Sequence, residues 1–94
     1  MTMATTEELQ FTARAKTHID MCNVQSRDAP PEDVALSALY AAARYSAFIC
    51  LRVNASKAQM AESRDEAVAM FGAQFRQMFS DCYDEYLGSY DQAK

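Results

Sequence analysis

The sequence predicts an all-α protein, an up-down-up three-helix bundle that dimerisation completes. Half of the 94 residues are hydrophobic, while Gly and Pro number only two each. Few turn formers and many helix formers favour a small number of long helices. Residues 34–53 are apolar in almost every helical direction, and their only charges are Arg44 and Arg52. A helix that is apolar all round is normally buried on several sides, so we expect it at the centre of the bundle.

Three helical segments are expected within a single domain, residues 1–94. They run over about residues 6–26, 31–53 and 57–87, and residues 88–94 form a frayed tail. Thr5 and Glu8 have the spacing of a capping box at the first start. Apolar side chains then recur at three- and four-residue steps, which is typical of one buried helix face.

The second and third segments have clear breaks before them, but the third start has two alternatives. Adjacent prolines and acids at residues 30–33 suit the first turn of a helix. Farther along, Ser56 with Gln59 and Ser63 with Glu66 both have capping-box spacing. Residues 56–62 are therefore either the first turns of the third helix or a short separate helix.

Composition and charge argue against several classes of partner. The net charge of −4 lacks a basic stripe, so we expect no nucleic-acid binding. Arg44 and Arg52 interrupt the only candidate membrane span, so we expect no membrane partner. No basic region followed by an apolar stretch opens the chain, and its three Cys are not clustered. These features favour a cytoplasmic protein with reduced thiols.

No catalytic, cofactor or metal motif is evident, so we expect a non-enzymatic protein with no cofactor and no bound metal. His18 and Cys22 are four residues apart on one helix face, a possible metal-ligand spacing. One Cys falls in each predicted helix, but the antiparallel second helix should separate Cys50 from Cys22. Free Cys packed as small hydrophobic residues, with His18 at the edge of the face, is the simpler interpretation.

The end of the third segment combines acids with aromatic residues. Acidic side chains near a helix C-terminus oppose the helix macrodipole, by about 0.3–1 kcal/mol each. An acidic-aromatic end of this kind could receive a basic partner, although offset of the charge by Arg27 or by solvation is the simpler interpretation. Its members are Asp81, Tyr83, Asp84, Glu85 and Tyr86.

The second segment offers a contact face. Arg44, Phe48 and Arg52 step by four residues, with Tyr45 beside them. An aromatic ring between two cations is typical of a protein interface, so we expect a homodimer or another protein as partner. The alternative is that both Arg side chains pass the core and pair with acids of the third helix.

Two other functions stay open beside protein–protein interaction. The first alternative is a binding module that holds an apolar small molecule in a Met- and aromatic-rich core between the second and third helices. Phe71, Phe75, Phe79 and Tyr83 form an aromatic ladder on one side of it. A closed apolar cavity lined by Tyr40, Phe71 and Phe75 would support this alternative. A small enzyme with a site at a subunit interface ranks third.

Several blocks of the chain are similar to a known family. They are LYAAARYSAF at residues 39–48, RDEA at 64–67, FRQM at 75–78 and YDEYL at 83–87. In this order they resemble a family of short bacterial proteins of no assigned activity, domain of unknown function 3144. The resemblance covers roughly residues 10–88 and implies a bacterial, cytoplasmic, helical protein. It supplies no catalytic residues.

Overall fold

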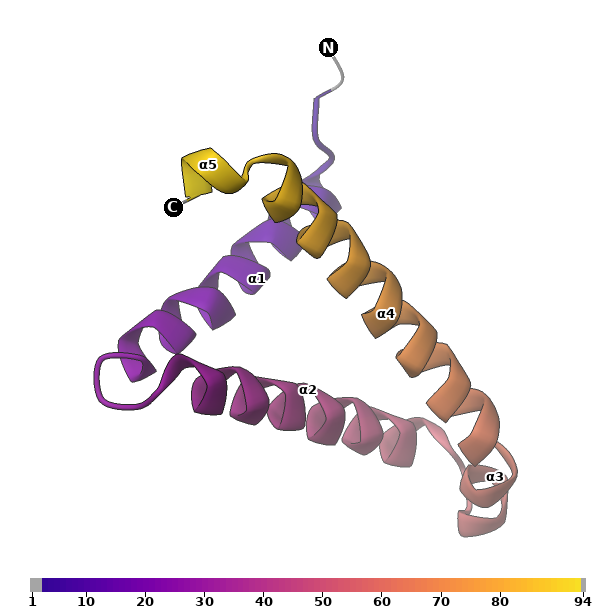
Figure 1. Ribbon diagram of the computed structural model, residues 1–94. Coiled ribbons are helices and arrows are strands. Elements are labelled where there is room, and N and C mark those ends of the chain that lie inside the picture. The colour runs from indigo at the N-terminus through magenta and orange to yellow at the C-terminus, as the bar shows by residue number, and fades with distance from the viewer. Residues whose placement is uncertain (1–2, 94) are drawn as a thin grey trace. The chain divides into compact units, whose positions relative to one another are not determined.

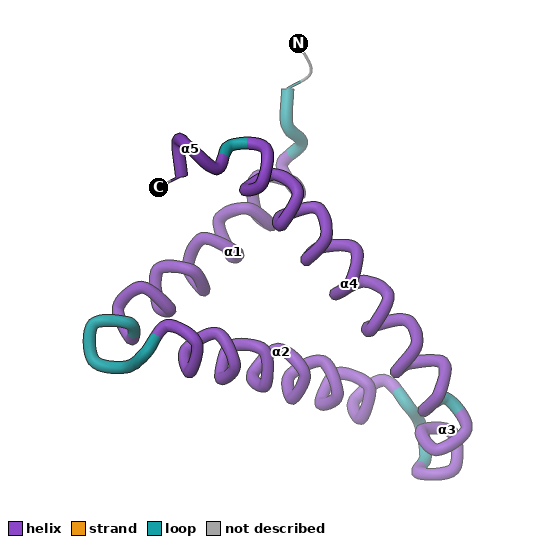
Figure 2. Tube along the Cα trace, viewed as in Figure 1, coloured by secondary structure: helices purple, strands orange, loops and turns teal. Residues whose placement is uncertain are grey.

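The computed structural model describes residues 3–93, and within this range the protein is all-α, as predicted (Figures 1 and 2). Loops are confined to short connections between the helices and to the residues before the first helix (Figure 2). The elements are α1 (Thr6–Gln25), α2 (Pro31–Val53), α3 (Lys57–Glu62), α4 (Arg64–Gly88) and α5 (Tyr90–Ala93).

The chain divides into two units, Met1–Ala47 and Phe48–Lys94. The boundary lies inside α2, which is continuous from Pro31 to Val53. The first unit contains α1 and the greater part of α2. The second contains the last turns of α2 followed by α3, α4 and α5.

Helix α1 begins where its capping signal predicts. Thr5 is extended, and its Oγ1 accepts a hydrogen bond of 3.1 Å from the Glu8 backbone N–H. The helix ends at Gln25, one residue before the predicted end, because Ser26 closes it. The backbone N–H and the hydroxyl of Ser26 both donate to the Cys22 carbonyl at 2.9 Å.

The first turn of α2, next to its connection with α1, contains the one buried side chain among residues 3–92. The Pro30 carbonyl accepts hydrogen bonds from the backbone N–H groups of Asp33 at 3.0 Å and Val34 at 3.2 Å. Pro31 is the first helical residue, where its missing N–H costs nothing. Val34 is only 5% exposed, and Ala29 of the connection is half-buried. Local folding of the turn thus anchors one apolar residue at the start of α2.

Residues 57–87, expected as one segment, form two helices. Of the two alternatives for residues 56–62, the structure shows the short separate helix. The Ser56 hydroxyl accepts from the Gln59 N–H at 3.1 Å, and the Gln59 side-chain oxygen accepts from the Ala55 N–H at 3.0 Å. These bonds start α3. Ser63 has helical backbone angles and makes no side-chain cap, so it joins the end of α3 to the start of α4.

The C-terminal end also differs from the predicted frayed tail. Helix α4 ends at Gly88, which does not adopt a positive φ. Ser89 closes it instead: its N–H and hydroxyl donate to the Glu85 carbonyl at 3.2 and 3.1 Å. The Gln92 N–H then donates to the Ser89 carbonyl at 3.0 Å within the single turn of α5. The last residue of the expected tail, Lys94, is outside the described residues.

The two serines with capping-box spacing should respond differently to substitution. Ser56→Ala removes a hydroxyl that caps α3, so it should lower the free energy of unfolding by about 1 kcal/mol. Ser63→Ala is the matched control, since Ser63 makes no side-chain cap, and it should stay within about 0.5 kcal/mol of wild type. Urea unfolding followed by circular dichroism measures both. Equal effects would contradict the assigned start of α3.

A second pair of substitutions tests the buried position at the start of α2. Val34→Ala removes two buried methyl groups and should cost about 1–2 kcal/mol of stability. Val53→Ala makes the same chemical change at a side chain that is 75% exposed, so its cost should be much smaller. Thermal unfolding of the two variants compares them. A cost at Val53 equal to that at Val34 would show that the end of α2 is buried in solution.

Candidate interaction surface

The predicted contact face lies along α2. Four-residue steps in a continuous α-helix place Arg44, Phe48 and Arg52 on one side, with Tyr45 next to them. The Tyr45 residue is 66% exposed and Phe48 is 45% exposed, and both arginines are exposed. This set of four residues is called the Arg-Phe-Arg face below. It carries a large ring and two cations that a partner can contact.

Two members of the Arg-Phe-Arg face contact each other. The Arg52 guanidinium carbon lies 5.8 Å from the centroid of the Phe48 ring, a cation–π distance. Such a contact is worth about 0.5–1 kcal/mol at an exposed site. It orders the long Arg52 side chain beside the ring, and thus presents an apolar surface and a positive charge together.

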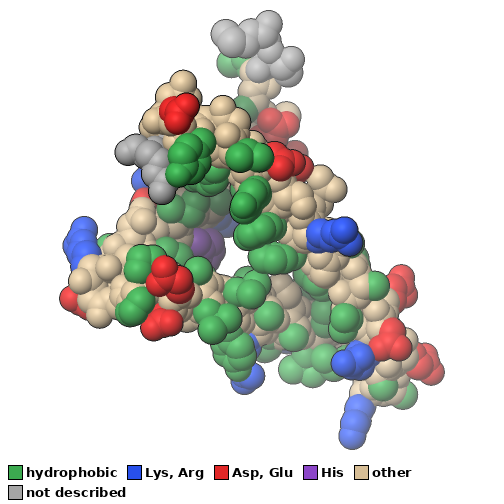
Figure 3. All heavy atoms as spheres, viewed as in Figure 1, with side chains coloured by type: hydrophobic (Ala, Val, Ile, Leu, Met, Phe, Trp, Pro, Cys, Tyr) green, Lys and Arg blue, Asp and Glu red, His purple; other side chains and the backbone are tan. Residues whose placement is uncertain are grey.

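Large apolar side chains are exposed on every long helix of the structure. Hydrophobic side chains are visible on the surface of α2 and α4 in Figure 3. Within residues 3–92, only Val34 falls in the buried class. Local contacts within the helices and turns therefore leave most of the apolar surface uncovered. The most exposed examples in α1, α2 and α4 are Leu9, Leu36, Tyr45, Val53, Tyr86 and Leu87.

The aromatic ladder predicted on the third helix is present on α4. The rings of Phe75 and Phe79 are stacked with centroids 5.9 Å apart, and those of Phe79 and Tyr83 are also 5.9 Å apart and tilted. These spacings are typical of favourable aromatic pairs. Phe75, Phe79 and Tyr83 are 50%, 57% and 60% exposed, so the ladder forms an apolar stripe along the helix surface.

The acidic-aromatic end is exposed at the last turns of α4. Asp81 accepts a hydrogen bond of 2.9 Å from the Gln77 side chain, a neutral donor. Asp84 and Glu85 are exposed, as are Tyr83 and Tyr86. The carbonyl groups at this helix end are bonded by Ser89, but no basic residue lies in the last turn of α4. No basic side chain in the last turn of α4 therefore offsets the negative charge here.

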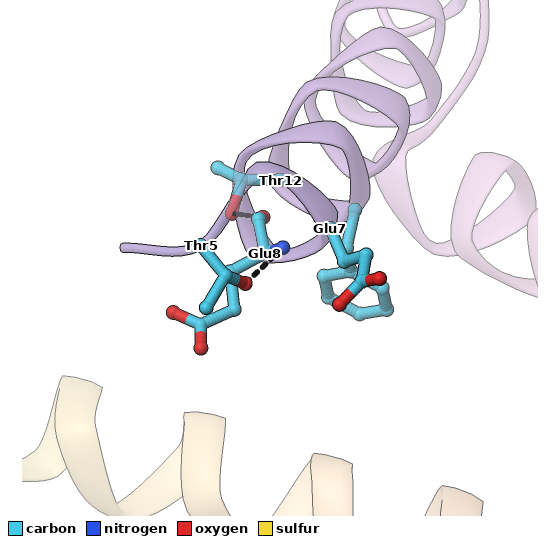
Figure 4. Close-up of a pocket in the computed structure, with 5 residues that line it drawn as sticks. Thr5, Glu7, Glu8 and Thr12 are labelled. Carbon is cyan, nitrogen blue, oxygen red and sulfur yellow. Dashed lines mark hydrogen bonds between the residues drawn. The ribbon is translucent and has the colours of Figure 1, made fainter. Parts of the chain in front are cut away.

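Two hollows open on the surface of the first unit. One, of about 550 Å³, lies along the first two turns of α1 between Thr5, Glu7, Glu8, Phe11 and Thr12 (Figure 4). Its two threonines are bonded to the Glu8 backbone, which leaves the acids as its free polar groups. The other, of about 410 Å³, lies at the start of α2. Its lining comprises Gln25, Asp28, Ala29, Asp33, Val34 and Ser37.

Reasoning from the sequence missed the hollow at the start of α2. It identified the Pro-Pro break and the acids after it, but assigned them only to helix initiation. The available signal was Val34, an apolar residue in the first turn directly after Asp33. The buried Val34 and the half-buried Ala29 line this hollow together with Asp28 and Asp33.

The candidate metal ligands do not form a cluster in the described chain. His18 is exposed, Cys22 and Cys50 are half-buried, and Cys82 is exposed. Across residues 3–93 no group of three or more His, Cys, Asp or Glu side chains is placed to hold a metal ion. Packing of all three thiols as small hydrophobic residues is wrong for Cys82, which lies on the exposed surface of α4.

Helix α2 also meets the length and hydropathy criteria for a membrane span, with a mean hydropathy of 1.5 over its most apolar window. The central helix of a soluble bundle has the same length and composition. The composition of α2 therefore indicates an apolar surface that must be covered. It does not distinguish whether protein or lipid covers it.

Comparisons with known proteins identify one family. Neither the curated proteins nor the solved structures contain a match to the chain. The family described as "Protein of unknown function (DUF3144)" matches residues 11–87, which extend from α1 to the last turn of α4. This range includes the Arg-Phe-Arg face and the acidic-aromatic end. The chain thus belongs to the DUF3144 family, for which no activity is assigned.

Proposed function

We propose that this protein acts by protein–protein interaction as a homodimer, through the Arg-Phe-Arg face of α2. The observation that carries the proposal is the exposure of apolar residues on all long helices, with Val34 alone buried among residues 3–92. Exposed apolar surface on this scale marks a site of association in soluble proteins. Burial of Tyr45 and Phe48 supplies the affinity, and charge-assisted bonds at the edge of the face orient the contact.

The apolar faces of the three long helices are covered in two ways under this proposal. Short connections favour antiparallel packing of sequential helices, so α1, α2 and α4 pack as an up-down-up bundle. A chain of this size has a thin core, and a second copy increases the buried area. Because α2 is apolar on nearly all sides, it contacts α1 and α4 of its own chain and a second copy at once.

A protein partner fits the charges of α2 better than a membrane does. Arg44 lies near the middle of the helix, where a charged side chain costs about 2.5–3.5 kcal/mol in a bilayer. At a protein interface the same side chain extends to the rim and keeps its charge in water. The acidic balance of the chain, −4 overall, argues against nucleic acid. We therefore propose that the protein is cytoplasmic and that its partner is a second copy of the same chain.

Replacing Phe48 tests the proposal. Phe48→Ala should leave the helical circular dichroism unchanged and weaken dimerisation at least about tenfold, because two rings are lost per dimer. Analytical ultracentrifugation over a concentration series measures the change. Leu36→Ala is the matched control on α2, at a side chain that is 67% exposed and lies about one third of a turn from Phe48.

The outcomes separate an interface from an internal core position. A Phe48→Ala protein that stays folded and fully associated would refute the proposed contact. If Phe48 instead belongs to the core of one chain, the substitution should cost about 3–5 kcal/mol of stability. Phe48→Leu then keeps the protein folded, and unchanged dimerisation in that variant with a lower melting temperature would identify the core position.

A further inference from the structure

We propose that two copies pair through antiparallel α2 helices, so that Phe48 of each copy enters the hollow at the start of α2 in the other. This inference rests on the proposed homodimer and specifies its contact. The occupant is a second copy of this chain. The site is the hollow lined by Asp28, Ala29, Asp33, Val34 and Ser37.

The lining of the hollow combines apolar and acidic residues. Val34 is only 5% exposed and so is almost fully covered by its own chain, whereas Ala29 is half-buried and supplies apolar surface that a ring can contact. The Ser37 hydroxyl donates to the Val34 carbonyl at 2.9 Å. Because this hydroxyl is already bonded on its own helix, covering it with an aromatic ring leaves no unpaired donor. Asp28 and Asp33 add two negative charges to the lining.

The proposed occupant has the matching chemistry. The Phe48 ring supplies apolar surface, and the Arg52 guanidinium lies 5.8 Å from its centroid. A lining that combines the apolar surface of Ala29 with two acids can therefore receive the ring and the cation as one group. Arg is able to bind a carboxylate through two parallel hydrogen bonds, which fixes the orientation of the contact as well as its charge.

The spacing along α2 matches in the antiparallel direction. Asp33 and Ser37 are one four-residue step apart, and so are Phe48 and Arg52. Both pairs lie on the same side of the helix, within about 60° of Phe48 at 100° per residue. Let the two antiparallel helices be centred on the midpoint between Ala42 and Ala43. Counted in residues along α2, Ser37 and Phe48 lie equally far from this midpoint on opposite sides. Asp33 and Arg52 do so as well. When Phe48 lies level with Ser37 of the second copy, Arg52 thus lies level with its Asp33.

Two-fold symmetry completes this arrangement. An isologous contact uses the same surface on both copies, so one register forms two ring-and-hollow contacts and two Arg52–Asp33 pairs. Ala41 is the residue level with Arg44, and its small side chain leaves room for the Arg44 stem to reach solvent. In a parallel pairing, by contrast, Arg52 would lie level with Arg52 and Asp33 with Asp33. Like charges would then face each other at both positions.

Complementary charge reversal tests the register. Asp33→Lys and Arg52→Glu should each weaken homodimerisation at least about tenfold, because each places like charges at both symmetric positions. Mixing the two variants should restore a heterodimer with affinity near that of wild type. One contact in it is the native Arg52–Asp33 pair, and the other is a reversed pair. Native mass spectrometry distinguishes the heterodimer from both homodimers by mass.

A control and three outcomes make the experiment decisive. Glu32→Lys makes the same charge change in the first turn of α2. At 100° per residue Glu32 lies on the side of the helix opposite Phe48, so this substitution should leave dimerisation unchanged. Restoration on mixing supports the register. The register is wrong if Asp33→Lys does not weaken the dimer, or if the two variants fail to form a heterodimer on mixing. Either result is still compatible with a homodimer. A wild-type protein that is monomeric at all concentrations refutes the homodimer itself.

Discussion

The need to cover apolar surface determines the properties of this protein. Helix formation satisfies the backbone of nearly every described residue, but the local contacts of these helices bury only Val34 within residues 3–92. Isolated helices have little stability in water, and most helical stability in proteins comes from packing an apolar face. Helix α2 is the extreme case, because residues 34–53 are apolar on nearly every side. Under the proposed function, the stability of the protein and its contact with a second copy therefore depend on the same side chains.

Local sequence signals predicted the helices well, because these signals act within a few residues. The Thr5–Glu8 spacing predicted the start of α1, and the proline pair predicted the start of α2. The Ser56 and Ser63 signals were equivalent by spacing, and only the backbone distinguishes them. Ser56 is extended and caps α3, whereas Ser63 has helical angles and makes no cap. Closure of α4 by Ser89 was also not predicted, and Gly88 at the helix end has no positive φ.

The candidate surface was predicted in part. Spacing placed Arg44, Phe48 and Arg52 on one face, and the structure adds the cation–π contact between Phe48 and Arg52. The hollow that this face matches could not be predicted in the same way. It depends on how the turn after α1 folds over Val34, which brings Asp28 of the connection next to Asp33 of the helix. Residues from a turn and a helix share that site, and no single periodic pattern contains both.

If α2 supplies both affinity and stability, as proposed, this has a consequence for the family. Substitutions on α2 that preserve its apolar character but alter Asp33 or Arg52 would keep the helix and change the choice of partner. Charged positions at two ends of an apolar face are a common means of specifying register between helices. The DUF3144 family match extends over residues 11–87, so it includes both ends of this face.

The most direct measurement is native mass spectrometry of the untagged wild-type protein, purified from its own host and diluted over a range of concentrations. It reports the number of subunits and any retained small molecule together. A dimer with no added mass, which dissociates on dilution to a folded or unfolded single chain, is the predicted result. A monomer throughout the range, above all one with a reproducible added mass, would contradict the homodimer and identify a ligand-binding protein instead.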